Sequence, residues 1–147
     1  MENYPNYRIA VEVIIIHGNK ILLTKRADDC VVAPGVWNVP AGKVKYEEIP
    51  IEALYREAKE ETNLNVELIK ELNVRAFKSR STIEDIYRTV YTYLVKAKNN
   101  DLTDFTINEE HSEYAWVTKE ELLNERFNSL HKNLKSILLS VSNEYIK

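Results

Sequence analysis

The chain has 147 residues, of which 20 are lysine or arginine and 23 are aspartate or glutamate, giving a formal net charge of -3. A chain of this length suits one hydrophobic core, so we expect a single domain over residues 1–147. Both signs of charge are mixed along the sequence without a basic block, which excludes an extended nucleic-acid-binding surface, and no nucleic acid is expected as a partner.

The N-terminal segment MENYPNYRIA lacks the order of basic and then apolar residues that is typical of a signal peptide. The longest aliphatic run, Val13 to Ile16, is too short to span a bilayer, so no membrane insertion is expected. The single cysteine, Cys30, excludes an internal disulfide and fits a reducing compartment. We therefore expect a cytoplasmic protein.

Residues 7–17 and 20–26 are rich in β-branched and aliphatic residues and flank the turn signal Gly18-Asn19, which predicts two strands joined as a hairpin. The next segment, residues 27–48, contains two prolines and two glycines among small and polar residues and has no helical period. We expect a long loop there. Loops of such length inside a compact domain are usually functional.

Residues 50–62 predict a helix, because Pro50 suits the first helical position and apolar side chains recur at helical spacing. The recurring residues, which we expect to face the core, are Ile51, Leu54, Tyr55, Ala58 and Thr62. Residues 65–79 and 85–98 follow as expected strands, the second one because of its valines, threonines and tyrosines.

Residues 113–123 predict a short strand that leads into a helix, whose start would be a capping box between Thr118 and Glu121. The C-terminal region has the spacing of an amphipathic helix. Its expected core-facing residues are Leu130, Leu134, Ile137, Leu138, Val141 and Tyr145.

The predicted helix sets three glutamates, Glu57, Glu60 and Glu61, on one strip of its surface, because side chains three and four positions apart lie on neighbouring turns. The last two fall in the final turn, where the helix dipole disfavours carboxylates, and only Arg56 and Lys59 on the helix can offset them. A solvated acidic face is the simplest explanation of such a strip. The tolerated repulsion instead favours a bound cation, and carboxylate oxygens select Mg²⁺, Mn²⁺ or Ca²⁺ rather than zinc.

The residues around the strip fit a longer pattern, which resembles the Nudix box GX5EX7REUXEEXGU, where U is aliphatic. Six of the seven fixed positions match over 23 consecutive residues. The matching residues, aliphatic positions included, are Gly42, Glu48, Arg56, Glu57, Ala58, Glu60, Glu61 and Leu64. The lead-in WNVPAG, residues 37–42, is similar to the W-x-x-P-G-G that usually introduces the box.

Two positions depart from the family pattern. Asn63 replaces the second glycine of the box, just past the expected helix end, and asparagine also tolerates the left-handed conformation of a helix C-cap. Ala41 replaces the glycine that usually precedes Gly42, and a methyl group there leaves a backbone carbonyl free to bind metal. Neither departure removes a carboxylate.

The resemblance to the MutT-like members of the Nudix hydrolase family implies an α/β fold, an α/β/α sandwich with a mixed central sheet. It also implies metal-dependent hydrolysis of a pyrophosphate bond in a nucleoside diphosphate linked to another group, with Mg²⁺, or alternatively Mn²⁺, as the cofactor. A nucleoside triphosphate is the favoured substrate. Dinucleoside polyphosphates, ADP-ribose, nucleotide sugars and a non-catalytic nucleotide-binding domain are the alternatives, and a homodimer is a family-level expectation.

The resemblance assigns the box residues to roles. Glu57, Glu60 and Glu61, with the segment Ala41–Gly42, would hold metal, and Glu57 would also act as ligand or base. Arg56 would orient the carboxylates, the alternative being a simple helix salt bridge. Glu48 would tie the loop to the helix through Arg56, the alternative being a favourable charge near the helix N-terminus.

Residues outside the box complete the expected site. A second loop offers Glu109, Glu110 and Glu113, of which Glu110 and Glu113 are favoured as ligand or general base. His111, between them, is a candidate acid or base, with a solvated loop histidine as the plainer reading. Lys25 and Arg26 resemble a position that contacts substrate phosphate, the alternative being exposed charges at a strand end. Trp37 is expected to line the base site, and Trp116 is expected in the core.

Overall fold

The computed structural model describes residues 6–79 and 86–146. It begins with strands β1 (Asn6–His17) and β2 (Lys20–Arg26), which pair antiparallel next to their turn. Gly18 has a φ of 60°, a left-handed conformation that glycine adopts without steric cost, and this confirms the predicted hairpin.

The expected loop at residues 27–48 is wrong in part, because it contains two short strands. Strand β3 (Trp37–Asn38) pairs with β2, and β4 (Ala41–Lys43) pairs antiparallel with β1 at Ala10–Glu12. Strands of two or three residues are too short to leave a period in the sequence. Strand β4 sets the backbone of Ala41 and Gly42 directly beside the first strand.

The remaining strands are β5 (Val66–Ser79), β6 (Ile86–Ala97) and β7 (His111–Val117). The order within the sheet is β3-β2-β1-β6-β5, with β4 added to β1 and β7 added to β2. Strand β1 runs parallel to β6, whereas β5 and β7 pair antiparallel with their neighbours. The sheet is therefore mixed, as expected.

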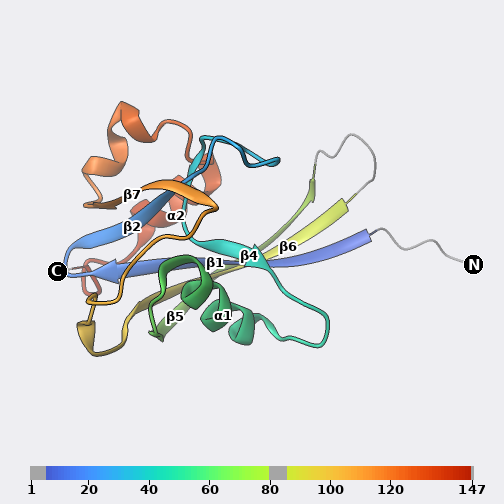
Figure 1. Ribbon diagram of the computed structural model, residues 1–147, viewed down its shortest axis with the longest axis horizontal. Helices are drawn as coiled ribbons and strands as arrows, with labels where there is room; N and C mark the ends of the chain where they lie inside the picture. Colours follow the sequence, from blue (N-terminus) through green and yellow to red (C-terminus); the bar gives the residue numbers. More distant parts are fainter. Residues whose placement is uncertain (1–5, 80–85, 147) are drawn as a thin grey trace, which may run out of the picture.

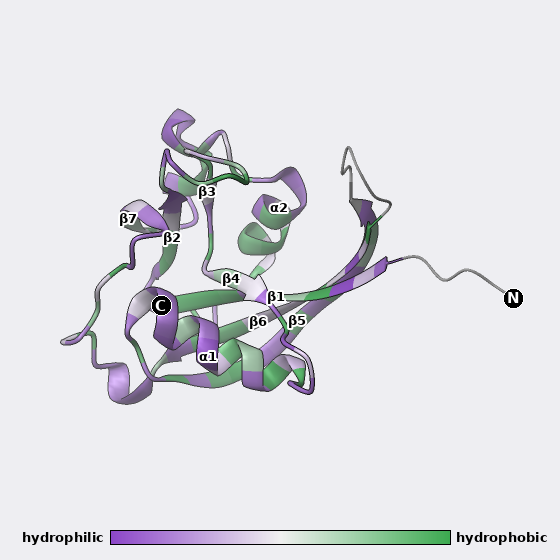
Figure 2. Ribbon diagram, turned by 45° about the vertical axis from the view of Figure 1, so that its right-hand side comes forward, coloured by the Kyte–Doolittle hydropathy of each residue, from purple (hydrophilic) through white to green (hydrophobic). Residues whose placement is uncertain are grey.

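Helix α1 (Pro50–Thr62) and helix α2 (Lys132–Ser140) lie on opposite sides of this sheet (Figure 1). Strand β1 is buried on both faces: Val13 and Ile15 pack in the core beside α1, while Ile14 and Ile16 pack in the core beside α2. Hydrophobic residues accordingly run along the middle of β1 (Figure 2). This arrangement confirms the predicted α/β/α sandwich.

Helix α1 has the predicted ends. Pro50 is its first residue, and Asn63 closes it at a φ of 57°, donating its backbone N–H to the Lys59 carbonyl. The buried face, however, is rotated from the predicted one: Tyr55 is 41% exposed, whereas Glu57 and Glu61 are buried. Glu57 and Glu61 thus lie within the packed face of the helix and not on a solvated acidic face.

The C-terminal third departs most from the predicted helices. Thr118 and Glu121 make both hydrogen bonds of the capping box, each 3.2 Å long, but only a 3₁₀ turn (Glu121–Leu123) follows. Helix α2 is shorter than expected, with the buried Leu130 and Val141 outside its ends. None of the helices in the described residues is long and apolar enough to cross a membrane.

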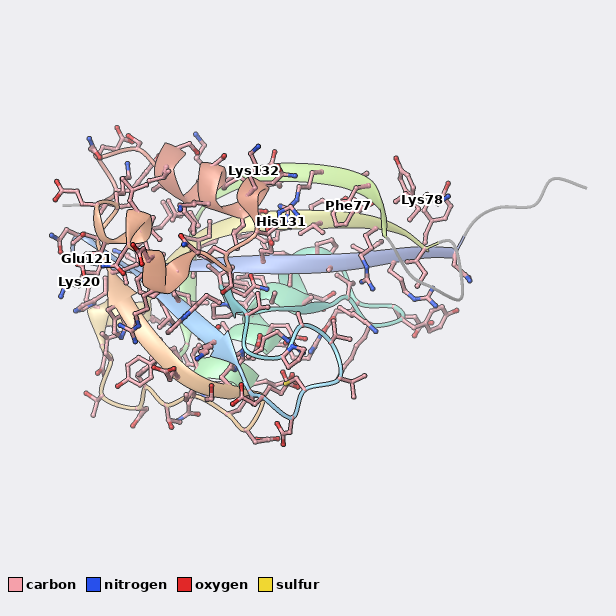
Figure 3. The ribbon with its side chains drawn as sticks, turned by 90° about the horizontal axis from the view of Figure 1, so that it is seen from above. Lys20, Phe77, Lys78, Glu121, His131 and Lys132 are labelled. Carbon is pink, nitrogen blue, oxygen red and sulfur yellow. The ribbon has the colours of Figure 1, made fainter. Side chains whose placement is uncertain are left out.

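Strand β5 extends beyond the part of the sheet that α2 covers. In Figure 3, His131 and Lys132 mark the start of α2, and Phe77 and Lys78 lie further along toward the projecting end of the sheet. Phe77 is 40% exposed there. Both helices lie beside the part of β1 that is away from this projecting end of the sheet.

Candidate functional site

Arg56 is the centre of a hydrogen-bonded network on α1. Its Nε and Nη2 both donate to Glu48 at 2.8 Å, and its Nη1 donates to Glu57 Oε1 at 2.7 Å. It also donates to Glu60 Oε2 at 3.2 Å and to the Lys43 carbonyl at 2.9 Å, so all five of its N–H donors are engaged. The guanidinium holds the pKa of Glu48 at about 2, and the carboxylates in turn raise the pKa of Arg56.

Glu57 packs directly against Gly42. A Cβ atom built on Gly42 would lie 2.1 Å from both Cδ and Oε1 of the Glu57 side chain. The backbone of Gly42 is not in the left-handed region, so conformation does not demand glycine here. Glycine is needed because the Glu57 carboxylate approaches too closely to leave room for a Cβ atom. Burial raises the pKa of Glu57, although Arg56 opposes that rise.

Glu61 is held from two sides. Its Oε2 accepts the backbone N–H of Ala41 at 3.0 Å, and its Oε1 lies 3.3 Å from His111 Nε2. Burial, together with the charges of Glu57 and Glu110, raises the pKa of Glu61 to about 9. This shift favours the protonated form of the Glu61 carboxyl in the metal-free protein.

A cleft of about 470 Å³ brings much of the predicted site together. Its acidic lining residues are Glu57, Glu60 and Glu110, its basic ones are Arg26, Lys43, Lys45 and Arg56, and Ala41 and Gly42 complete the wall. Lys43 and Lys45 were not among the predicted residues, because isolated lysines in a loop carry no pattern. Glu109, the third acid of the second loop, does not line this cleft.

Lys25, Trp37 and Glu113 do not line this cleft. The three residues face one another across β2, β3 and β7, and Lys25 Nζ pairs with Glu113 Oε2 at 3.2 Å. Trp37 is 3% exposed and packs against Phe127 in the core beside α2. Successive strand residues point to opposite faces of a sheet, so Lys25 and its neighbour Arg26 are separated.

The predicted core position of Trp116 is confirmed in part, because it is half-buried against the core beside α1. His111, by contrast, is buried, which overturns the plainer reading of a solvated loop histidine. Burial lowers its pKa, and the nearby Arg26 lowers it further. Sequence alone gave no signal of this burial, because the histidine is flanked by polar loop residues.

The donor set fits a hard divalent cation. Within residues 6–79 and 86–146, no three ligating side chains stand close enough together to hold a metal ion. Arg56 contacts the Glu57 carboxylate, and His111 contacts the Glu61 carboxyl. All the candidate donors are nevertheless oxygens. Burial and the charges of Glu57 and Glu110 raise the pKa of Glu61, so a negative charge on Glu61 is disfavoured without a cation.

We expect Glu61→Gln to stabilise the metal-free protein at alkaline pH. The pKa of Glu61 rises from 4.5 to about 9 on folding, so the folded state binds the proton more tightly and stability is lost as pH rises between these values. The loss approaches about 1.4 kcal/mol per pH unit in this window, and glutamine, which mimics the protonated acid, removes it.

Urea unfolding with a chelator at pH 7, 8 and 9 measures this effect. His111 titrates with the opposite sign below its unfolded value of 6.5, so its contribution lies outside the alkaline window. The control is Glu52→Gln, which removes a carboxylate from the first turn of the same helix. A midpoint urea concentration for wild-type unfolding that stays constant from pH 7 to 9 would contradict the prediction.

Comparison with known proteins agrees with this geometry. The family model described as the NUDIX domain matches residues 6–136. A nucleoside triphosphatase NudI from Enterobacter sp. (strain 638) is 32% identical over 123 residues, covering 78% of this chain and 84% of that protein. The NudI of Klebsiella pneumoniae (strain 342) is 32% identical over 127 residues, covering 83% of this chain and 89% of that protein.

Solved structures give the same result for the fold. The MutT protein from Methanosarcina mazei Go1 has a TM-score of 0.73 at 23% identity, over 99% of this chain and 100% of that chain. An Ap4A hydrolase from C. elegans has a TM-score of 0.70 at 20% identity, over 89% of this chain and 92% of that chain. At these identities the likeness concerns the fold alone.

Proposed function

The chain belongs to the Nudix hydrolase family, and on this premise we propose that it hydrolyses a pyrophosphate bond of a nucleoside triphosphate. The observation that carries the proposal is the cleft in which box carboxylates face exposed cations. The name of the NudI relatives, nucleoside triphosphatase, supports the substrate class. Nudix hydrolases generally use a divalent metal, and we propose Mg²⁺ here, with Mn²⁺ as the alternative.

Glu57, Glu60 and Glu61 would hold the metal on α1, with the Ala41 carbonyl from β4 and Glu110 from the opposite loop. A divalent ion in such a site lowers the pKa of bound water and neutralises charge on the phosphates. The segment Ala41–Gly42 is positioned for this role by its pairing with β1. The metal is proposed on donor chemistry and charge.

The other residues of the cleft bind and orient the substrate. Arg26, Lys43 and Lys45 line the same cleft as the carboxylates, so each can pair with a phosphate oxygen as the polyphosphate enters. All the N–H donors of Arg56 already bind protein acceptors, so its proposed role is to hold Glu57 and Glu48 in place. As the alternative to binding metal, Glu110, which lines the cleft, is the candidate base that removes a proton from the attacking water.

A cytoplasmic location and a homodimer are part of the proposal. Cys30 Sγ lies 3.4 Å from the Glu110 carbonyl, where a reduced thiol donates to the loop that carries the candidate base. A reducing compartment would preserve this contact. Sedimentation of the purified protein tests the dimer independently of activity.

The decisive experiment measures phosphate and pyrophosphate release from a panel of substrates, each with Mg²⁺, with Mn²⁺ and with a chelator. The panel contains nucleoside triphosphates, including those with oxidised purines, together with dinucleoside polyphosphates, ADP-ribose and nucleotide sugars. Metal-dependent turnover that is fastest on a nucleoside triphosphate is the expected result. Faster turnover of another class would overturn the proposed substrate, and nucleotide binding without turnover of any class would indicate a regulatory domain.

A further inference from the structure

The turn formed by residues 108–111 fixes the ring of His111. Its Nδ1 lies 2.9 Å from Asn108 Oδ1, and that amide oxygen also accepts the backbone N–H of Glu110 at 3.3 Å. The His111 backbone N–H donates to the Asn108 carbonyl at 3.1 Å. An amide oxygen only accepts hydrogen bonds, so Nδ1 carries a hydrogen and the other ring nitrogen is left to face Glu61.

The contact between His111 and Glu61 is closed to water. Their side chains are 2% and 3% exposed, and Nε2 lies 3.3 Å from Glu61 Oε1. The ring nitrogen and the carboxyl oxygen are therefore within hydrogen-bonding distance at a contact from which water is excluded. The other carboxyl oxygen is held by the Ala41 N–H, so both oxygens of Glu61 have fixed partners.

We infer that His111 is a positioning residue, which orients the Glu61 carboxyl and ties the loop that carries Glu110 to helix α1. The inference rests on the proposed function, in which Glu61 on helix α1 and Glu110 on the loop before β7 both hold metal. Outer partners that fix a ligand in this way typically contribute about 10- to 100-fold to metal affinity.

The test compares His111→Phe, which keeps a ring of similar volume without the hydrogen bond, with His111→Gln, whose amide can donate or accept a hydrogen bond at a similar reach. Mn²⁺ affinity is measured without substrate, by electron paramagnetic resonance of the free ion. We expect His111→Phe to raise the Kd for Mn²⁺ about 10- to 100-fold, and His111→Gln to recover most of the lost affinity. His17→Phe, at the turn end of β1, is the matched control.

A purely structural role would give a different result. It would lower the melting temperature of metal-free His111→Phe and leave its Kd for Mn²⁺ unchanged at a temperature where it is folded, and this outcome overturns the inference. If His111→Phe does not fold, Asn108→Ala is the test instead. It removes the partner of His111 Nδ1, and we expect it also to raise the Kd for Mn²⁺. Wild-type protein that fails to bind Mn²⁺ would instead refute the proposed function.

Discussion

Replacing Glu57 with glutamine should reduce kcat about 10²- to 10³-fold, a loss comparable to removal of one preorganised charge-stabilising group. Glu57 is a proposed metal ligand, and Arg56 and Gly42 hold it in one orientation. Glutamine keeps the shape and still accepts from Arg56, but it lacks the negative charge that binds a divalent cation. Steady-state hydrolysis of the best substrate at saturating Mg²⁺ measures the effect.

Glu60→Gln should also lower turnover strongly if Glu60 binds metal, although this side chain is 51% exposed and has only the Arg56 ion pair among the described contacts. The control is again Glu52→Gln, which removes the same charge from the first turn and should retain wild-type kcat. Wild-type rates in both Glu57→Gln and Glu60→Gln would refute the metal site. A marked fall in metal-free stability would show that the Arg56 network is chiefly structural.

Gly42→Ala should impair the enzyme almost as severely, because the added methyl carbon would lie 2.1 Å from the Glu57 carboxyl. The backbone of Gly42 is fixed by its pairing with Val11 in β1, so the side chain of Glu57 must move. Misplacement of a catalytic group by about 1 Å costs about 10²-fold in rate. We expect a loss of kcat near that size, with overpacking that destabilises the fold by about 1–3 kcal/mol.

The matched control for this substitution is Ala41→Gly, which restores the glycine found in the family pattern and adds no volume. It should change kcat little, since Ala41 acts through its backbone N–H and carbonyl. Circular dichroism and urea unfolding separate loss of fold from loss of activity. Gly42→Ala with wild-type kcat would mean that the Glu57 carboxylate does not need its observed position.

Local signals in the sequence predicted both ends of helix α1. Pro50 at the first position and Asn63 at the C-cap act through their own backbone conformations, so tertiary contacts are not needed to interpret them. The spacing of Glu57, Glu60 and Glu61 likewise follows from the helical period alone. The capping box of Thr118 formed as predicted, yet only a 3₁₀ turn followed, because a cap does not decide how long a helix continues.

Residues outside regular local patterns were placed only by the tertiary structure. Lys25 and Arg26 are neighbours in sequence, but the alternation of strand β2 sends only Arg26 to the acidic cleft. Trp37 was predicted beside the substrate and instead lies in the core against Phe127. The position of Glu113 was likewise not predictable from the sequence, because it pairs with Lys25 outside the cleft.

By itself, the sequence determined the set of carboxylates, because exact spacing along one helix encodes them. The resemblance of the whole box to the family pattern implied the mixed α/β architecture. The tertiary structure decided which of these carboxylates are buried and what holds them. Arg56 reaches Glu48 across the loop, and His111 reaches Glu61 from a strand fifty residues further along the chain. Such contacts depend on how separate elements pack together, and no local period in the sequence records that packing.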